Sequence, residues 1–272
     1  MAIPKKIHYC WLSDEKMPKD LVLSIESWKR VMPDYEFVLW DMNKFDINSV
    51  PWVAEACSVK KWAFAADYIR VFSVYTEGGI YLDTDVYVFK RFDDLLDYNF
   101  FSSYEWNNPT KIFKDVVNSD WDDIQTVGGI QIEAAMFGGA QGLPFLKDCM
   151  NWYENRRFIL PGEKGYNQVI SPQVYAAVAQ KYGFRYVADE QILQDNMIIF
   201  PQGTKFYSPF HNTHWDGYHD GIYAVHWHAA AWTFKPNPIK KFIRNLKDND
   251  RIRKLFGKKP ILTMDKLIKQ KH

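Results

Sequence analysis

Short apolar runs alternate along this chain with longer segments in which apolar residues recur at helical spacing. Strands are predicted over residues 5–11, over residues 35–40 and up to Asp83, and helices over residues 18–31, near Val53 and over residues 58–76. Strands that alternate with helices form a mostly parallel sheet with helices on its faces. The pattern therefore predicts an α/β fold with a mostly parallel central sheet flanked by helices, in which ligands bind beyond the carboxyl ends of the strands.

The pattern is less regular in the second half of the chain. We expect a strand over residues 86–89, a short turn or helix from Asp93, one strand over residues 129–139, helices near residues 143–155 and 172–181, and late strands over residues 197–200 and 222–226. The polar and acidic residues 106–128 predict a loop with some helix, and long connections of this kind often cover a cleft.

Length and composition indicate a single soluble enzyme domain. A chain of 272 residues with 47% hydrophobic and 17% aromatic residues can bury a large core, which excludes a disordered protein. No apolar run approaches the roughly 20 residues that cross a bilayer, and the N-terminus lacks a secretory signal. We therefore expect a cytoplasmic protein. Its three cysteines, Cys10, Cys57 and Cys149, have no metal-binding spacing, which favours buried reduced thiols.

The charges are unevenly distributed. Residues 235–272 hold ten lysines and three arginines against three aspartates, so we expect a catalytic domain over residues 1–234 and a basic helical extension over residues 235–272. The extension carries an apolar stripe of Ile239, Phe242 and Ile243 among its lysines. Such a helix can lie on an anionic membrane surface, which would make the protein peripheral on the inner face of the membrane, or it can dock on the domain with its lysines solvated. Nucleic acid is not an expected partner, because no binding module is present.

A glycine turn at Gly78 and Gly79 precedes an apolar strand that ends on Asp83 and Asp85. Acids two residues apart project to the same side of an extended strand, so both can face one cation. Two carboxylates suit Mg²⁺ or Mn²⁺, which also bind phosphate oxygens, and a metal-bound phosphate ester is the expected ligand. The alternative is a solvated turn in which one aspartate caps the backbone.

Asp67 and Arg70 lie three residues apart on the predicted helix over residues 58–76, so they share a face. One alternative is a surface ion pair that contributes little. In the other, Asp67 accepts from a sugar or ribose hydroxyl and Arg70 offers a planar fork to a phosphate. The neighbouring acid pair favours this functional interpretation.

Together these segments resemble glycosyltransferase family 32, which contains bacterial capsule and lipopolysaccharide sugar transferases and is related to the glucosylating domains of large bacterial toxins. The resemblance rests on residues 3–11, 27–29, 33–36, 65–70, 78–86, 142–145, 207–209 and 226–232, in the family's order and over most of the chain. It implies the GT-A type of nucleotide-sugar fold and transfer of a sugar with retention of anomeric configuration.

The resemblance also implies roles for individual residues. Trp11 would stack on the nucleobase, although a core tryptophan is the alternative, and Asp67, Arg70 and Asp83 would bind the donor. Near the C-terminus, Trp232 would contact the diphosphate.

The resemblance makes His226 a third metal ligand beside Asp83 and Asp85. His228 is an alternative ligand, since on a strand it shares a face with His226. Ala231 stands where the family usually has serine, so any hydroxyl contact from that position is lost.

No acid stands out as a nucleophile, and Asp123 and Glu133 are the candidates. The polar segment that contains His211, His214, Trp215 and His219 is either an acceptor-binding loop or a packed surface loop. We thus expect a retaining transferase that uses Mn²⁺ or Mg²⁺ to move a hexose, galactose or glucose, from a UDP-sugar to a glycan or lipid acceptor in cell-envelope synthesis. A metal-dependent phosphoester hydrolase and a non-catalytic nucleotide-sugar binding protein are the alternatives.

Overall fold

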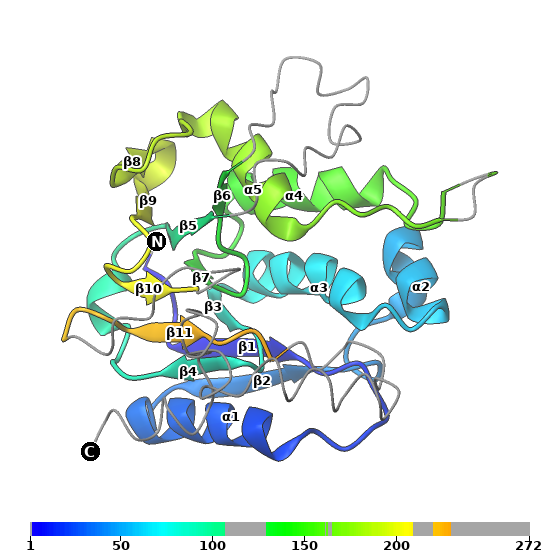
Figure 1. The fold of residues 1–272 in the computed structure, drawn as a ribbon, viewed down its shortest axis with the longest axis horizontal. Coiled ribbons are helices and arrows are strands. Elements are labelled where there is room, and N and C mark those ends of the chain that lie inside the picture. Colours follow the sequence, from blue (N-terminus) through cyan, green and yellow to red (C-terminus); the bar gives the residue numbers. More distant parts are fainter. Residues whose placement is uncertain (1, 107–128, 161, 163–164, 209–219, 230–272) are drawn as a thin grey trace, which may run out of the picture.

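The computed structural model describes residues 2–106, 129–160, 162, 165–208 and 220–229 (Figure 1). Its helices are α1 (Lys19–Val31), α2 (Pro51–Ser58), α3 (Trp62–Glu77), α4 (Pro144–Glu154) and α5 (Ser171–Ala179). Its strands are β1 (Lys6–Cys10), β2 (Glu36–Trp40), β3 (Gly79–Leu82), β4 (Val86–Val88), β5 (Phe100–Trp106), β6 (Ile130–Ile132), β7 (Met136–Gly139), β8 (Gln191–Leu193), β9 (Met197–Phe200), β10 (Phe206–Tyr207) and β11 (Ala224–His226).

The larger sheet has the strand order β2-β1-β3-β7-β5-β9-β8, with β6 paired to β5 beside this path. β1 runs parallel to both β2 and β3, and β5 runs parallel to β9. β7 lies antiparallel between β3 and β5, so β3 and β5 also point the same way. The expected α/β fold class is confirmed: the protein has a mostly parallel central sheet flanked by helices.

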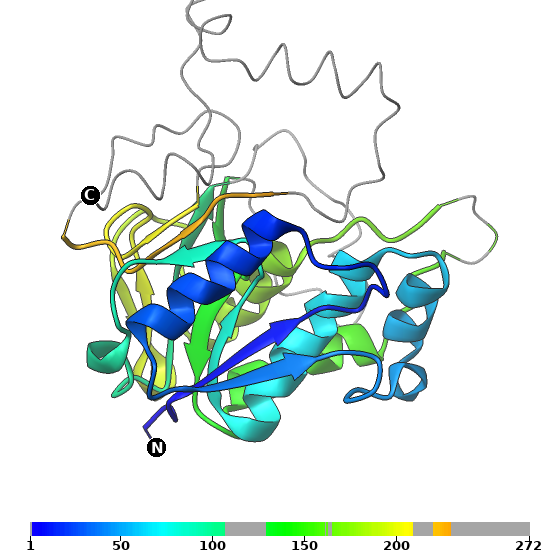
Figure 2. The ribbon, with the colours of Figure 1, turned by 90° about the horizontal axis from the view of Figure 1, so that it is seen from below.

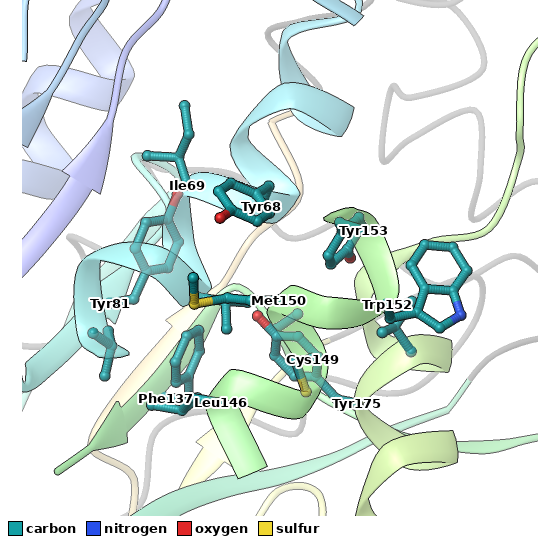
Figure 3. Packing of buried hydrophobic residues seen from close by; sticks show 14 of the residues in the cluster. Tyr68, Ile69, Tyr81, Phe137, Leu146, Cys149, Met150, Trp152, Tyr153 and Tyr175 are labelled. Atoms are coloured by element: carbon teal, nitrogen blue, oxygen red, sulfur yellow. The ribbon is translucent and has the colours of Figure 1, made fainter. Parts of the chain in front are cut away.

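Side chains from successive residues of the central strands enter two separate cores. Tyr81 of β3 and Phe137 of β7 join the core under α2, α3, α4 and α5, part of which is drawn in Figure 3. Their neighbours Ile80 and Met136 join the opposite core, which also contains Trp28 of α1. Figures 1 and 2 show α1 on one side of β1 and β2 and α3 on the other. Because both faces of the central sheet are covered, every residue of β3 and β7 is buried.

Two glycines allow α3 to lead directly into β3. Gly78, with φ of 64°, ends the helix through a hydrogen bond from its N–H to the carbonyl of Val74. Gly79 has φ of 118°, and a Cβ there would come within 2.7 Å of the Lys6 carbonyl oxygen. This close approach fixes β3 beside β1, and β3 then delivers Asp83 to the carboxyl end of the sheet.

A second sheet of three strands has the order β10-β11-β4. β4 follows Asp85, and α1 holds it: the indole Nε1 of Trp28 donates to the Val86 carbonyl at 2.7 Å, and Ser27 Oγ accepts from Val88 N at 3.0 Å. β11 pairs with β4 in antiparallel register, which places His226 opposite Val86. This small sheet brings the late residues 224–229 beside the two acids.

Several expectations need correction. The strand predicted over residues 129–139 is two strands, β6 and β7, and Glu133 lies in the break between them. The segment from Asp83 to Asp85 is a turn rather than extended strand, since Val86 N donates to the Asp83 carbonyl at 2.9 Å. The sequence pattern did not predict β5, β8 and β10.

The expectation for the cysteines is confirmed, and two others concern residues that the structure does not describe. The three cysteines are buried and unpaired, as expected. In the described part of the chain, every helix is too short or too polar to span a bilayer. Of the loop predicted over residues 106–128, Trp106 is the last residue of β5, and residues 107–128 lie outside the described residues, as does the basic extension over residues 235–272.

Candidate metal and donor site

Three of the proposed metal ligands converge at the end of β3. Ligand atoms of Asp83, Asp85 and His226 all lie within 4.8 Å of one another. The two aspartates come from the turn between β3 and β4, and His226 is the last residue of β11. The turn is held from the larger sheet, because Asp83 N donates to the Ala135 carbonyl at 2.7 Å. The acids therefore converge through a tight turn and not through strand alternation.

Asp83 is held by side chains from α3 and β3. Its Oδ1 accepts from the Tyr81 hydroxyl at 2.9 Å and lies 3.4 Å from Nη2 of Arg70. The same Nη2 lies 3.1 Å from Oδ1 of Asp67. The side chains of Arg70 and Asp67 are only 7% and 10% exposed, so this is a buried charge cluster and not a surface ion pair. With both aspartates beside it, the guanidinium is neutralised inside the protein.

Burial and neighbouring charges set the protonation of this cluster. Burial raises the pKa of Asp83 to about 6, against the lowering effect of Arg70 and with a further increase from the charge of Asp85. Burial also raises the pKa of Asp67, although Arg70 opposes this shift. The side chain of Asp83 is nevertheless 24% exposed, which leaves its carboxylate accessible to a ligand.

Asp85 is held by the residues around β11. Its Oδ1 lies 3.3 Å from His226 Nε2, and its Oδ2 accepts from the backbone N–H of Ala229 at 2.8 Å. Burial would raise the pKa of Asp85, but the charge and hydrogen bond of His226 have a larger effect and lower the pKa to about 2. Burial would lower the pKa of His226, but Asp85 and Glu133 raise it well above its ordinary value. Asp85 and His226 thus form a charged pair when no metal lies between them.

Glu133 lies behind His226. Its Oε1 is 3.6 Å from His226 Nδ1 and accepts from the backbone N–H of Ala135 at 2.8 Å. The residue is 1% exposed. Burial would raise the pKa of Glu133, but His226 lowers it to about 2. Glu133 is therefore an ionised carboxylate in contact with the imidazole and shielded from solvent.

His228 lies next to this cluster but outside the set of three converging ligands. β11 ends at His226, and the backbone of His228 has φ of 52°, so the two histidines do not share a strand face. Their rings instead lie against each other with centroids 3.7 Å apart. Ser208 Oγ lies 2.9 Å from His228 Nε2 and 3.5 Å from His226 Nδ1, so this hydroxyl joins both rings.

The donor set fits a divalent cation. Two carboxylates and one imidazole are the ligands that Mn²⁺ accepts, and Mg²⁺ prefers the oxygens among them. Asp83, Asp85 and His226 are each only partly buried, which leaves room for substrate oxygens. These three residues would hold the ion, and their chemistry suits either of the two metals.

Trp11 follows β1 at the same edge of the sheet. β1 and β3 pair with His8 opposite Tyr81, so continuing the register places Cys10 opposite Asp83 and Trp11 just beyond it. Trp11 is partly exposed, and its indole Nε1 donates to the Glu15 carbonyl at 2.9 Å. It does not belong to the buried core, and its predicted stacking on a base stays a prediction.

Some predicted site residues cannot be placed. Asp123 and Trp232 lie outside the described residues, as does the segment with His211, His214 and Trp215. Sequence reasoning missed Tyr81 as a partner of Asp83 and Ser208 as a partner of the two histidines. Ser208 lies in a segment that carried the family resemblance, which was a usable signal, whereas Tyr81 had none beyond its position two residues before Asp83.

The comparison with family models supports this site. Residues 18–102 match the model described as the glycosyltransferase sugar-binding region containing the DXD motif, and Asp83 and Asp85 are the DXD acids within that range. Residues 18–102 are therefore similar to the sugar-binding region of glycosyltransferases. The match covers about a third of the chain and agrees with the family resemblance there. The segment around His226 lies outside the matched residues.

Curated relatives agree over a similar length. The chain is 40% identical over 101 residues to inositol phosphoceramide mannosyltransferase 3 of Schizosaccharomyces pombe, which covers 36% of this chain and 28% of the relative. It is 30% identical over 120 residues to glucan organizing enzyme 1 of Cryptococcus neoformans, which covers 36% of this chain and 33% of the relative. The chain thus matches about a third or less of the length of these relatives.

Solved structures give weaker similarity. The PaToxG glycosyltransferase aligns with a TM-score of 0.47 at 16% identity, over 66% of this chain and 70% of that protein. The galactosyltransferase LgtC aligns with a TM-score of 0.43 at 12% identity, over 88% of this chain and 94% of that protein.

Proposed function

We propose that this protein is a metal-dependent hexosyltransferase that moves a sugar from a nucleoside diphosphate donor to a glycan or lipid acceptor. The observation that supports this most directly is the convergence of Asp83, Asp85 and His226, because the first two are the acids of the family's DXD motif. A divalent ion bound there would act as a Lewis acid that stabilises the charge on the departing diphosphate.

The chain's own residues prepare this site before any substrate binds. Tyr81 and Arg70 hold the Asp83 carboxylate, and the N–H of Ala229 holds that of Asp85. Fixed ligands keep the charges oriented, so little reorganisation accompanies the reaction. Trp11, at the same edge of the sheet, would bind the base of the donor by stacking.

The proposal also names candidate sugar donors and a class of acceptor. The sequence favours UDP-galactose or UDP-glucose, and retention of configuration follows from the family resemblance alone. The relatives named as inositol phosphoceramide mannosyltransferases add mannose as a candidate sugar and favour a lipid acceptor. We further propose a role in cell-envelope synthesis at the cytoplasmic face of a membrane, with the basic extension over residues 235–272 either on that membrane or docked on the domain.

A donor panel with Asp85→Asn tests the proposal. We expect nucleoside diphosphate release from one of UDP-galactose, UDP-glucose and GDP-mannose that depends on Mn²⁺ or Mg²⁺ and stops with EDTA. Asp85→Asn keeps the shape of the side chain but removes a ligand charge, so kcat should fall by about 10²–10³-fold. The matched control is Asp148→Asn, a partly exposed acid of α4 that pairs with Lys181.

Three results would contradict the proposal. Full activity of Asp85→Asn would exclude the metal clamp. Phosphate release that ignores the identity of the sugar would indicate a phosphoester hydrolase. Donor binding without turnover across a range of acceptors would indicate a nucleotide-sugar binding protein.

A further inference from the structure

We propose that Glu133 is a positioning residue for the cation site: its carboxylate orients the imidazole of His226 so that Nε2 faces Asp85. The inference rests on the proposed function, because it presumes that a divalent cation binds between these ligands. It assigns Glu133 a role different from that of a nucleophile.

The two ring nitrogens of His226 face two different carboxylates. Nε2 lies 3.3 Å from Asp85 Oδ1, and Nδ1 lies 3.6 Å from Glu133 Oε1. A histidine that ligates a metal through one nitrogen is commonly oriented by a carboxylate at the other, which fixes the tautomer and raises the basicity of the ligand. His226 has the same arrangement: Nε2 faces Asp85 of the proposed cation site, and Nδ1 faces Glu133 on the opposite side of the ring.

Glu133 is itself held firmly. Its Oε1 accepts from the N–H of Ala135, and its own backbone N–H donates to the Ser103 carbonyl at 2.8 Å. Ser102 Oγ donates to the Glu133 carbonyl at 2.7 Å. A carboxylate fixed from both its side chain and its backbone can fix a neighbouring ring, whereas a mobile one cannot.

The backbone around Glu133 contacts the other half of the site. Arg70 Nη1 donates to the Ala134 carbonyl at 2.9 Å, and Asp83 N donates to the Ala135 carbonyl at 2.7 Å. The break between β6 and β7 turns these carbonyls away from the ladder and toward the site. Three consecutive residues, 133–135, therefore link His226, Arg70 and Asp83 to one rigid segment of the sheet.

The surroundings of Glu133 argue against a nucleophilic role. A nucleophile must touch the anomeric carbon of the donor. Glu133 is 1% exposed, and its second oxygen, Oε2, is buried without a hydrogen bond in the described part of the chain. His226 stands between this carboxylate and Asp85. A sugar at the cation site meets the imidazole before it reaches Glu133.

Direct titration of Mn²⁺, followed by the electron paramagnetic resonance of the free ion, tests this role without donor or acceptor. We expect Glu133→Gln to weaken Mn²⁺ binding by about 10–100-fold, the range for partners of metal ligands. The matched control, Glu154→Gln, removes a carboxylate that accepts from the Tyr68 hydroxyl on the helical side of the sheet, and it should bind Mn²⁺ as the wild type does.

A double-mutant cycle with His226→Ala separates positioning from a general charge effect. If Glu133 acts through His226, then Glu133→Gln should change Mn²⁺ affinity less than about twofold in the His226→Ala background. A loss of the same size in both backgrounds would overturn the proposal, because Glu133 would then act on the ion independently of the histidine.

The controls keep the inference separate from the proposed function. Wild-type protein that does not bind Mn²⁺ would refute the metal site and with it this inference. Wild-type protein that binds Mn²⁺ only as tightly as folded Glu133→Gln would refute the inference alone. If Glu133→Gln does not fold by circular dichroism, Glu133→Asp keeps the charge but withdraws the oxygens from His226. That variant must also bind Mn²⁺ more weakly, and unchanged affinity would overturn the proposal.

Discussion

The two acids of the site are held by different parts of the molecule. Asp83 contacts Arg70 and Tyr81, which belong to the helix and strand that immediately precede it. Asp85 contacts His226 and Ala229, which come much later in the chain. We call these the Asp83 side and the Asp85 side. The side-chain partners of Asp83 are therefore local in sequence, whereas those of Asp85 reach it only through long-range strand pairing.

The charges differ in the same way. The cation beside Asp83 is a guanidinium, which keeps its proton at every relevant pH. The cation beside Asp85 is an imidazole, which can also give up its proton and become a metal ligand. In the proposed metal site, the Asp83 side would thus provide a fixed frame, and the Asp85 side would provide the part that changes when a cation binds.

The largest expected effect is a loss of stability when Arg70 is removed from the Asp83 side. Arg70→Ala leaves the buried carboxylates of Asp67 and Asp83 without their cation, so we expect the free energy of unfolding to fall by about 3–5 kcal/mol. Urea denaturation measures this loss. The control is Arg157→Ala, because Arg157 pairs with Glu55 with its own side chain 63% exposed and should cost at most about 1 kcal/mol. Equal losses in the two variants would show that the Asp83 side does not depend on the buried charge.

The next effect concerns His8 of β1, which contacts the glycine turn that leads to Asp83. His8 Nε2 donates to the Gly78 carbonyl at 2.8 Å and its Nδ1 accepts from the Trp40 indole at 3.0 Å, so the ring is held neutral. Burial lowers the pKa of His8 from 6.5 to about 4. The unfolded chain therefore takes up this proton first as the pH falls, and the folded state loses stability between pH 6.5 and about 4.

This loss should reach about 3 kcal/mol and then level off at lower pH. Urea midpoints measured from pH 7 to below pH 4 follow it. His8→Gln can donate and accept in the same places without titrating, so its stability should depend less on pH in this window. If the two proteins show the same slope, the acid sensitivity comes from other groups.

The smallest effect concerns the Asp85 side. Trp227 follows β11, and its indole Nε1 donates to Ser24 Oγ of α1 at 3.1 Å. Trp227→Phe keeps an aromatic ring but removes this hydrogen bond, so thermal or urea unfolding should show a loss of about 1 kcal/mol. In a Ser24→Ala background the same change should have almost no further effect. An additive loss would mean that the indole stabilises the segment by packing alone.

The contrast between the two sides also explains what the sequence could predict. α3, β3 and the glycine stop between them followed from residue spacing because their signals lie within one short segment. The pairing of β4 with β11 and the position of β7 between β3 and β5 join residues far apart in the chain. No local pattern specifies such partners. The break at Glu133 did leave a signal, since a charged residue followed by two alanines interrupts an apolar run.

The candidate site also has a part that the sequence predicted and a part that it did not. The motif predicted Asp83 and Asp85, and the family resemblance added His226. The burial of Asp67 and Arg70 depends on later elements such as α4, which packs on α3 in the folded protein, so their helical face alone did not reveal it. The contacts of Ser208 and Glu133 with His226 depend on how β11 returns to the sheet.

The bond between Asp85 and Ala229 spans 144 positions of the sequence. A ribosome therefore makes both acids of the turn long before it makes the histidine that completes their cation site. While the chain is still being synthesised, β4 has no β11 beside it and the acids have only half of their final surroundings. The candidate cation site can consequently form only late in synthesis, and a product truncated before residue 224 would carry the complete motif without His226 or Ala229.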